Sequence, residues 1–253
     1  MIHIVGGSGY LGSHLRSLLH ADGIQFRTYD LRAPTEYQAL HTDFDSRKDS
    51  LRCAEEDTVI MLAGLPREPK GMEGDPLVSW QRVYRDVGRL MCRSNPRRIV
   101  YVSSAQVVYP AGGPSIYANN KAALELWYAE EYGQALRIIR PGTVWGGFGR
   151  GLPVRTDTAI NRHLATGVAL TDDYRAYTAH IDDVVADIID AARLEDCYGP
   201  PFVTCDLPCP TVPNDLTQFP MAARAIKERA AAVGTPLDES YRKWYEDFYG
   251  LPA

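Results

Sequence analysis

The stretch GGSGYLG at residues 6–12 constrains the fold of this chain more than any other part of its sequence. It directly follows the apolar run IHIV at 2–5 and opens a segment in which leucines recur at helical spacing. Glycine at Gly6, Gly9 and Gly12 permits a tight turn, close approach of backbone N–H groups to a pyrophosphate, and a helix start directed at the phosphates. This placement predicts a dinucleotide-binding turn that also includes Tyr10 and Leu11.

Short apolar runs alternate with helical stretches along the first 140 or so residues. Runs rich in Ile and Val, without strict polar alternation, predict buried strands at 2–5, 26–30, 58–62, 97–104, 136–141 and 202–205. Helical periodicity predicts helices at about 10–23, 81–94, 116–133, 157–167, 180–196, 215–234 and 235–250. This alternation predicts an α/β fold with a Rossmann-type, doubly wound parallel sheet.

Two segments interrupt this alternation of strands and helices and suggest how the chain divides into regions. Residues 62–80 form a long Gly/Pro-rich connection that we interpret as a functional loop, and residues 146–158 form a glycine-rich mobile linker or lid. We expect an NAD-binding core at 1–150, to which 176–206 returns. Residues 151–175 and 207–253 would form a small, reduced C-terminal substrate-binding region.

Charge and composition exclude several classes of partner. A net charge of −5 disfavours nucleic acid and membrane surfaces, and no apolar run reaches the length of a membrane helix. The N-terminal sequence shows no signal-peptide pattern, so a cytoplasmic location is expected. Five cysteines without metal-ligand spacing indicate neither a disulfide framework nor a metal site.

Asp30 ends the second predicted strand, beyond the glycine turn. A carboxylate there can accept hydrogen bonds from ribose hydroxyls and repels a 2′-phosphate, so it favours NAD over NADP. Arg32 leaves NADP open, because a guanidinium two residues further on could pair with that phosphate.

Tyr117 and Lys121 are four residues apart in a helical stretch and therefore share one helix face. Free tyrosine has a pKa of about 10, too high for an effective base at neutral pH. A lysine ammonium one turn away stabilises the phenolate and can also bind the ribose of a nicotinamide nucleotide. Alone, the pattern is common on solvated helix faces; after a glycine fingerprint it predicts an acid–base pair for hydride-transfer chemistry.

Taken in order, the motifs GGSGYLG, Asp30, TDF at 42–44, LAG at 62–64, VSSAQVVYP at 102–110, YANNK, RPGTVWG and HIDDV resemble the extended short-chain dehydrogenase/reductase family. Within it, the sequence is similar to the NAD-dependent epimerase/dehydratase branch that acts on nucleotide sugars. The resemblance implies catalysis by Tyr117 and Lys121 and a set of further cofactor contacts: Asp43, Phe44, Leu62, Ala63, Gly64, Pro141 and Val144. It also implies a homodimer, with the helix of Tyr117 as a candidate interface.

The substrate side departs from the family pattern. Ala105 occupies the usual Ser/Thr position that binds the reacting sugar oxygen, so Ser104 takes that role provisionally. In an extended strand Ser104 would point to the other face, unless a bulge around 105–106 turns it. Further substrate-binding candidates are Gln106, Thr143 and Arg175, which is one place from the family's diphosphate arginine. Trp145 is expected to stack in the pocket or pack in the core, and His180 is expected to be structural.

These residues favour an enzyme that binds NAD and acts on a hydroxyl or ketone of a nucleotide sugar, with epimerisation preferred over reduction. Dehydration is disfavoured, because Gln106–Val107 offers no acid pair. Two alternatives remain open: an NAD(H)-binding protein with little or no catalysis, which Ala105 and Ala176 favour, and a reductase of steroid-like or phenylpropanoid ketones.

Overall fold

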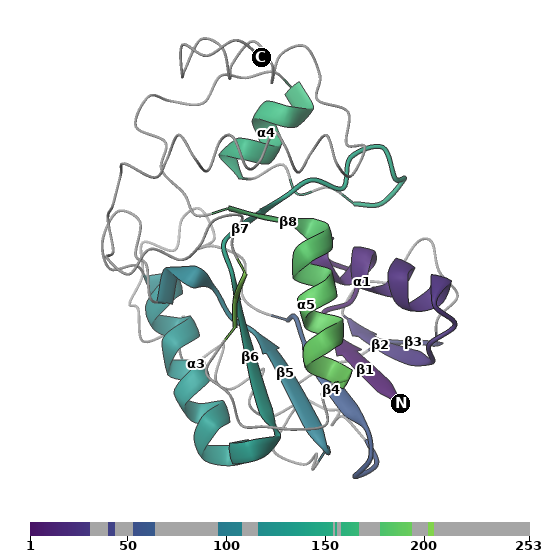
Figure 1. The fold of residues 1–253 in the computed structure, drawn as a ribbon, viewed down its shortest axis with the longest axis vertical. Helices are drawn as coiled ribbons and strands as arrows, with labels where there is room; N and C mark the ends of the chain where they lie inside the picture. Colours follow the sequence, from purple (N-terminus) through teal and green to yellow (C-terminus); the bar gives the residue numbers. More distant parts are fainter. Residues whose placement is uncertain are drawn as a thin grey trace.

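A computed structural model describes residues 1–30, 40–43, 53–63, 96–107, 116–153, 155, 158–166, 178–193 and 202–204. Seven parallel strands form one sheet in the order β3-β2-β1-β4-β5-β6-β9 (Figure 1). Their bounds are β1 Ile2–Val5, β2 Phe26–Asp30, β3 Leu40–Asp43, β4 Thr58–Met61, β5 Arg98–Val102, β6 Leu136–Pro141 and β9 Phe202–Thr204.

The strand order reverses next to β1. From β1 the chain runs outward to β2 and β3, then returns to place β4 on the other side of β1, so Ile2 pairs with both Phe26 and Thr58. In open parallel sheets, ligands bind at such a reversal, beyond the carboxyl ends of the strands. The glycine turn lies there, because it directly follows β1.

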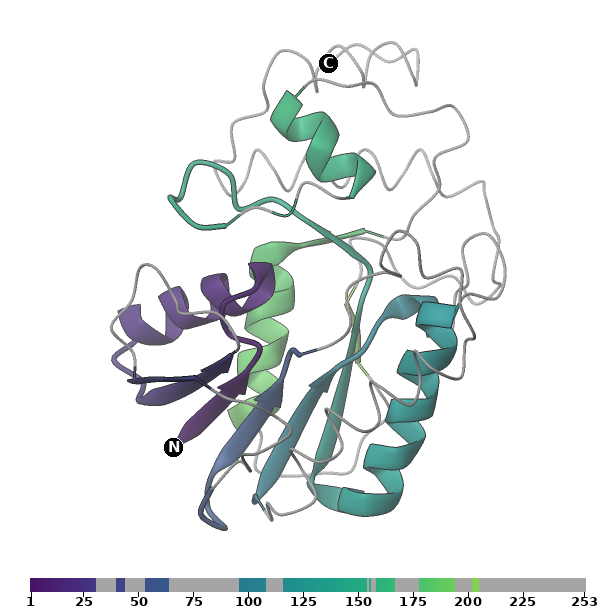
Figure 2. The same ribbon diagram turned by 180° about the vertical axis from the view of Figure 1, so that it is seen from behind.

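Helices cover both faces of the sheet. Neighbouring residues of a strand point to opposite faces, so both faces carry apolar side chains that the helices bury. On one face, α1 (Tyr10–Ala21) and α5 (Ile181–Arg193) pack Leu15, Leu19 and Val184 against Ile4 and Ile60. On the other face, α3 (Ile116–Tyr132) packs Leu124 and Tyr128 against Val5, Met61 and Tyr101. Figures 1 and 2 show α5 and α3 on opposite sides of the sheet, which confirms the doubly wound fold.

Beyond β6 the chain adds a small second layer of structure. Strands β7 (Thr143–Trp145) and β8 (Thr178–His180) pair in parallel, and α4 (Ala159–Thr166) lies above them in Figure 1. The helices predicted at 81–94 and beyond 207 lie outside the described residues. No described helix is both long and apolar enough to cross a membrane.

The structure adds three strands that the sequence did not predict and shortens one that it did. Sequence patterning missed β3, whose LHTD has no apolar run, and it missed β7 and β8, which are only three residues each. The strand predicted at 97–104 ends at Val102, and Ala105–Val107 forms a single 3-10 turn, η1.

Candidate active site

The glycine turn between β1 and α1 is built by close backbone packing. Gly6 has φ +87°, and a Cβ there would lie 2.7 Å from the backbone nitrogen of Ala63. A Cβ on Gly12 would lie 2.5 Å from the Cα of Gly7. Only glycine fits at these positions, because backbone atoms cannot move aside as a flexible side chain can.

Gly9 differs from the other glycines of the turn, because a Cβ there would meet nothing in the described structure closer than 3.6 Å, at the Gly6 carbonyl oxygen. Gly9 is the N-cap of α1 and provides no side-chain cap. The first N–H groups of a helix have no partner within it, and its N-terminus attracts anions. The turn therefore fits a dinucleotide pyrophosphate, which could approach the backbone at Gly9 and bind the N–H groups that follow.

Asp30 lies beside this turn. Its Oδ2 accepts a hydrogen bond from the backbone N–H of Ser8 at 2.8 Å, and its register partner on β3 is Asp43. The predicted cofactor residues Leu62 and Ala63 follow β4, and both donate their N–H groups to the carbonyl of Val5 at 2.9 Å. These bonds bring the ends of β1, β2 and β4 together at one edge of the sheet. Four predicted site residues lie outside the described ranges: Arg32, Phe44, Gly64 and Arg175.

Lys121 and Tyr117 are neighbours on α3. The Lys121 side chain is 8% exposed, and its Nζ lies 6.0 Å from the centroid of the Tyr117 ring. The same Nζ donates a hydrogen bond of 3.0 Å to the carbonyl of Val102, the last residue of β5. Burial lowers the pKa of Lys121 to about 8. The ammonium is therefore at the carboxyl end of β5, one strand beyond β4.

Ser104 lies beyond the end of β5, so the alternation of side chains along the strand does not decide where it points. The N–H of Ser103 donates to the carbonyl of Ile139, and the chain then turns into η1. The Ser104 hydroxyl accepts a hydrogen bond from the N–H of Gln106 at 3.2 Å, and Ala105 is buried. The expectation that the strand extends to Ser104 is therefore wrong. At the place where we expected a possible bulge, around 105–106, the chain forms a 3-10 turn.

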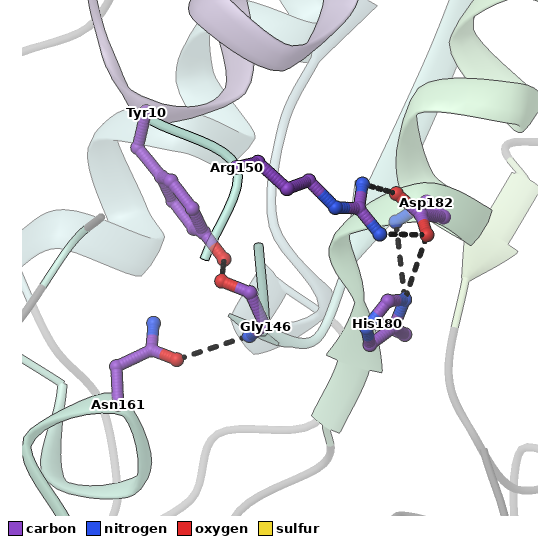
Figure 3. A network of polar contacts seen from close by, with 6 residues as sticks. All are labelled: Tyr10, Gly146, Arg150, Asn161, His180 and Asp182. Carbon is purple, nitrogen blue, oxygen red and sulfur yellow. Dashed lines mark hydrogen bonds and ion pairs between the residues drawn. The ribbon is translucent and has the colours of Figure 1, made fainter. Parts of the chain in front are cut away.

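The segment after β7 is tied to α1 and α4 (Figure 3). The Tyr10 hydroxyl donates to the carbonyl of Gly146 at 2.9 Å, and burial raises the pKa of Tyr10 above its ordinary range, so the hydroxyl stays protonated. Asn161 accepts from the N–H of Gly146 and donates to the carbonyl of Val144, both at 3.1 Å. The predicted linker thus begins as a segment hydrogen-bonded from two helices.

A second tie joins this segment to the start of α5. Arg150 forms two hydrogen bonds with the Asp182 carboxylate, at 2.5 and 2.7 Å, and these lower the pKa of Asp182 (Figure 3). His180 is fully buried, and its Nδ1 accepts the N–H of Asp182 at 3.3 Å. Its ring packs edge-on against Trp145, with centroids 4.6 Å apart. Trp145 is also fully buried, so it packs in the core and does not present an open stacking face.

Sequence reasoning missed one charged pair beside Lys121. Glu125 is four residues beyond Lys121 on α3, and Arg140 of β6 binds its carboxylate through two hydrogen bonds of 3.0 and 2.5 Å. The i, i+4 spacing of Glu125 was the available signal; Arg140 had none, because it is distant in sequence. The described residues contain no cluster of three or more groups able to hold a metal ion.

Comparisons with known proteins agree with this geometry. The sequence model of the NAD dependent epimerase/dehydratase family matches residues 2–193. This family is NAD dependent, which confirms the predicted cofactor at the level of the family. The curated proteins give no match.

Solved structures with the same fold share little sequence with this chain. MoeE5 in complex with UDP-glucose and NAD is 20% identical, with a TM-score of 0.67 over 92% of this chain and 82% of that chain. The NAD-dependent NDP-hexosamine 5,6-dehydratase TunA is 22% identical, with a TM-score of 0.59 over 76% and 72%. The UDP-glucose 4-epimerase of Thermotoga maritima is 18% identical, with a TM-score of 0.58 over 76% and 73%. The family match over most of its length, together with this fold, shows that the chain belongs to the NAD dependent epimerase/dehydratase family, within the extended short-chain dehydrogenases/reductases.

Proposed function

We propose that this protein carries out NAD-dependent redox chemistry at a hydroxyl or keto carbon of a nucleotide-activated sugar, with epimerisation as the leading reaction. The observation that carries the proposal is the buried Lys121 ammonium beside the Tyr117 ring, at the same edge of the sheet as the glycine turn. Family membership supports the reaction class. Solved neighbours that contain UDP-glucose or UDP-glucuronic acid support the substrate class.

The cofactor would lie across the ends of β1, β2 and β4. The backbone at Gly9 and the first turn of α1 would hold the pyrophosphate, and Asp30 would accept hydrogen bonds from the adenosine ribose. Asp43, Leu62 and Ala63 would line the adenine side, and the Pro141–Val144 segment would lie beside the nicotinamide. Bound NAD supplies the acceptor and donor of the hydride.

Side chains of this protein would transfer the proton of the sugar hydroxyl. Tyr117 as phenolate would take the proton of the sugar hydroxyl and return it when the carbonyl is reduced. Lys121 would stabilise the phenolate by its charge and bind the nicotinamide ribose. Ser104 would donate its hydroxyl proton to the sugar oxygen, because accepting the N–H of Gln106 leaves that proton available.

A second candidate is an NAD(H)-binding protein with little catalysis. Ala105 favours it, because a buried methyl group lies at the first position of η1, where the family resemblance leads us to expect a Ser or Thr hydroxyl. Reduction of a keto-sugar by NAD(P)H is the other alternative and uses the same residues. Homodimer formation through α3 and a cytoplasmic location stay predictions.

Replacing Tyr117 by Phe tests the leading proposal. We expect Tyr117→Phe to lower turnover of UDP-sugars by about 100-fold or more, because it removes the acid–base group. NAD affinity, measured by calorimetry, should stay within about twofold. Tyr132→Phe is the matched control, since Tyr132 lies at the opposite end of α3, and it should keep wild-type turnover.

The outcomes separate the candidates. Interconversion of two UDP-sugars without net change in NADH absorbance supports epimerisation, whereas stoichiometric loss of added NADH indicates a reductase. Full turnover by Tyr117→Phe would show that the base is wrongly assigned. NAD binding without turnover of any sugar nucleotide would favour the binding protein.

A further inference from the structure

Three side chains at four-residue intervals share one face of α3: Tyr117, Lys121 and Glu125. The proposed proton transfer uses the first two and gives no role to the third. Glu125 is nevertheless only 6% exposed. A buried carboxylate costs free energy unless it is paired, so its position needs an explanation.

Arg140 fixes this carboxylate from the neighbouring strand β6. Its Nε donates to Oε1 at 3.0 Å, and its Nη2 donates to Oε2 at 2.5 Å. A guanidinium bound to both carboxylate oxygens holds the group in one orientation. Glu125 is therefore a fixed negative charge, one helical turn from Lys121.

The other groups described around Lys121 are two phenol rings and a backbone carbonyl. Its Nζ lies 5.0 Å from the centroid of the Tyr101 ring, 6.0 Å from that of Tyr117, and 3.0 Å from the carbonyl of Val102. Burial raises the pKa of Tyr101 well above its ordinary value, so its phenol stays protonated. Among the described residues, Glu125 thus provides the negative charge that acts on Lys121.

Burial and Glu125 act on Lys121 in opposite directions. Burial removes water from the ammonium and is the larger effect, which lowers the pKa of Lys121 to about 8; the charge of Glu125 raises it. Without that charge, Lys121 would lose its proton closer to neutral pH. A neutral lysine cannot stabilise the Tyr117 phenolate by charge.

We propose that Glu125, fixed by Arg140, is a positioning residue that keeps Lys121 protonated at working pH and thereby maintains the acid–base competence of Tyr117. This inference rests on the proposed function for its catalytic consequence, but the charge coupling itself does not. If Glu125 only linked α3 to β6 through Arg140, Glu125→Gln would leave the titration of Lys121 unchanged.

The test measures the titration of Lys121 directly in the full-length, NAD-bound protein. Lysine labelled with 13C at Cε reports protonation by NMR, and the signal missing in Lys121→Met identifies the residue. We expect Glu125→Gln to move the titration midpoint of Lys121 down by about 1 pH unit, since an opposite charge at this range shifts a pKa by roughly that much or more. Glu125→Asp, which keeps the charge, should restore most of the shift.

Glu131→Gln is the matched control, because it removes an exposed carboxylate from the same helix; it should leave the midpoint unchanged. The alkaline limb of kcat/KM should move with Lys121 in Glu125→Gln. An unchanged Lys121 midpoint in folded Glu125→Gln overturns the inference, whatever the turnover. A shifted midpoint in Glu125→Gln, when the wild-type protein turns over no sugar nucleotide, would reject the proposed function alone.

The wild-type protein provides a test that needs no variant. If Glu125 and Lys121 are coupled, the 13Cδ signal of Glu125 should show an inflection at the pH where Lys121 titrates. Absence of that inflection also overturns the inference, even if Glu125→Gln fails to fold.

Discussion

Asp30 ends β2, and its carboxylate accepts a hydrogen bond from the N–H of Ser8 in the glycine turn. The side chain therefore lies at the turn that would hold the pyrophosphate, and it brings negative charge to that place. A 2′-phosphate on the ribose would meet this charge, whereas two ribose hydroxyls could donate to it. At the scale of one residue, discrimination between NAD and NADP depends on this carboxylate.

Substitution of Asp30 tests that discrimination. Asp30→Ala should weaken NAD binding by about 10- to 100-fold, the loss expected for hydrogen bonds to a charged group. Asp30→Asn keeps an acceptor for Ser8 but removes the repulsion, so NADP should gain affinity relative to NAD. Asp22→Ala, which removes a surface ion pair with Arg193 distant from the glycine turn, is the control. Unchanged NAD and NADP affinities in both Asp30 variants would contradict the assignment.

At the scale of elements, α4 is joined to the rest of the molecule through Asn161. This fully buried amide donates to the carbonyl of Val144 and accepts from the N–H of Gly146. Tyr10 of α1 donates to the carbonyl of the same Gly146 (Figure 3). The start of the glycine-rich segment is thus held from both the cofactor side and the side of α4. These bonds connect the glycine turn to the part of the chain where substrate binding is expected.

Removing the Asn161 amide should weaken the attachment of α4 and lower the stability of the protein. Asn161→Ala leaves the buried N–H of Gly146 and the partly buried carbonyl of Val144 without their partner, so we expect a loss of about 2–4 kcal/mol in the free energy of unfolding. Thr166→Ala on the same helix removes an exposed hydroxyl bonded to the carbonyl of Arg162 and should cost less than about 0.5 kcal/mol. Urea unfolding measures both variants. Equal stability of the two would show that Asn161 does not fix α4.

At the scale of the whole molecule, the proposed sites converge on one edge of the sheet. The glycine turn follows β1, Asp30 ends β2, Leu62 follows β4, and Lys121 reaches the end of β5. A dinucleotide bound along this edge would contact elements from both sides of the strand reversal. Its binding should therefore stabilise the fold as a unit.

Thermal unfolding in the presence of cofactor measures this effect. NAD at about 100 times its Kd should add about 2.7 kcal/mol, and therefore raise Tm by roughly 5–10 °C for a chain of this size. NADP at the same concentration should give a smaller rise, because of Asp30. No shift with either dinucleotide would contradict cofactor binding at this edge.

The strands that could be predicted are those marked by short apolar runs in the sequence. Apolar runs marked β1, β4 and β6, because a strand buried on both faces needs apolar residues. Edge strand β3 was missed, since LHTD carries no such run. The end of β5 was misplaced, because the 3-10 turn after Ser104 is built by contacts across the fold, including the bond from Ser103 to Ile139.

The sequence by itself determined the glycine turn, the acidic end of β2 and the Tyr117–Lys121 pair, because each depends on short spacings within one element or its boundary. Only the tertiary structure decided which charges and amides face one another: Arg140 with Glu125, Arg150 with Asp182, and Asn161 with Gly146. These pairs join different elements, and their geometry depends on how parallel strands and helices stack. That stacking arises from burial of the whole apolar core, which no local pattern records.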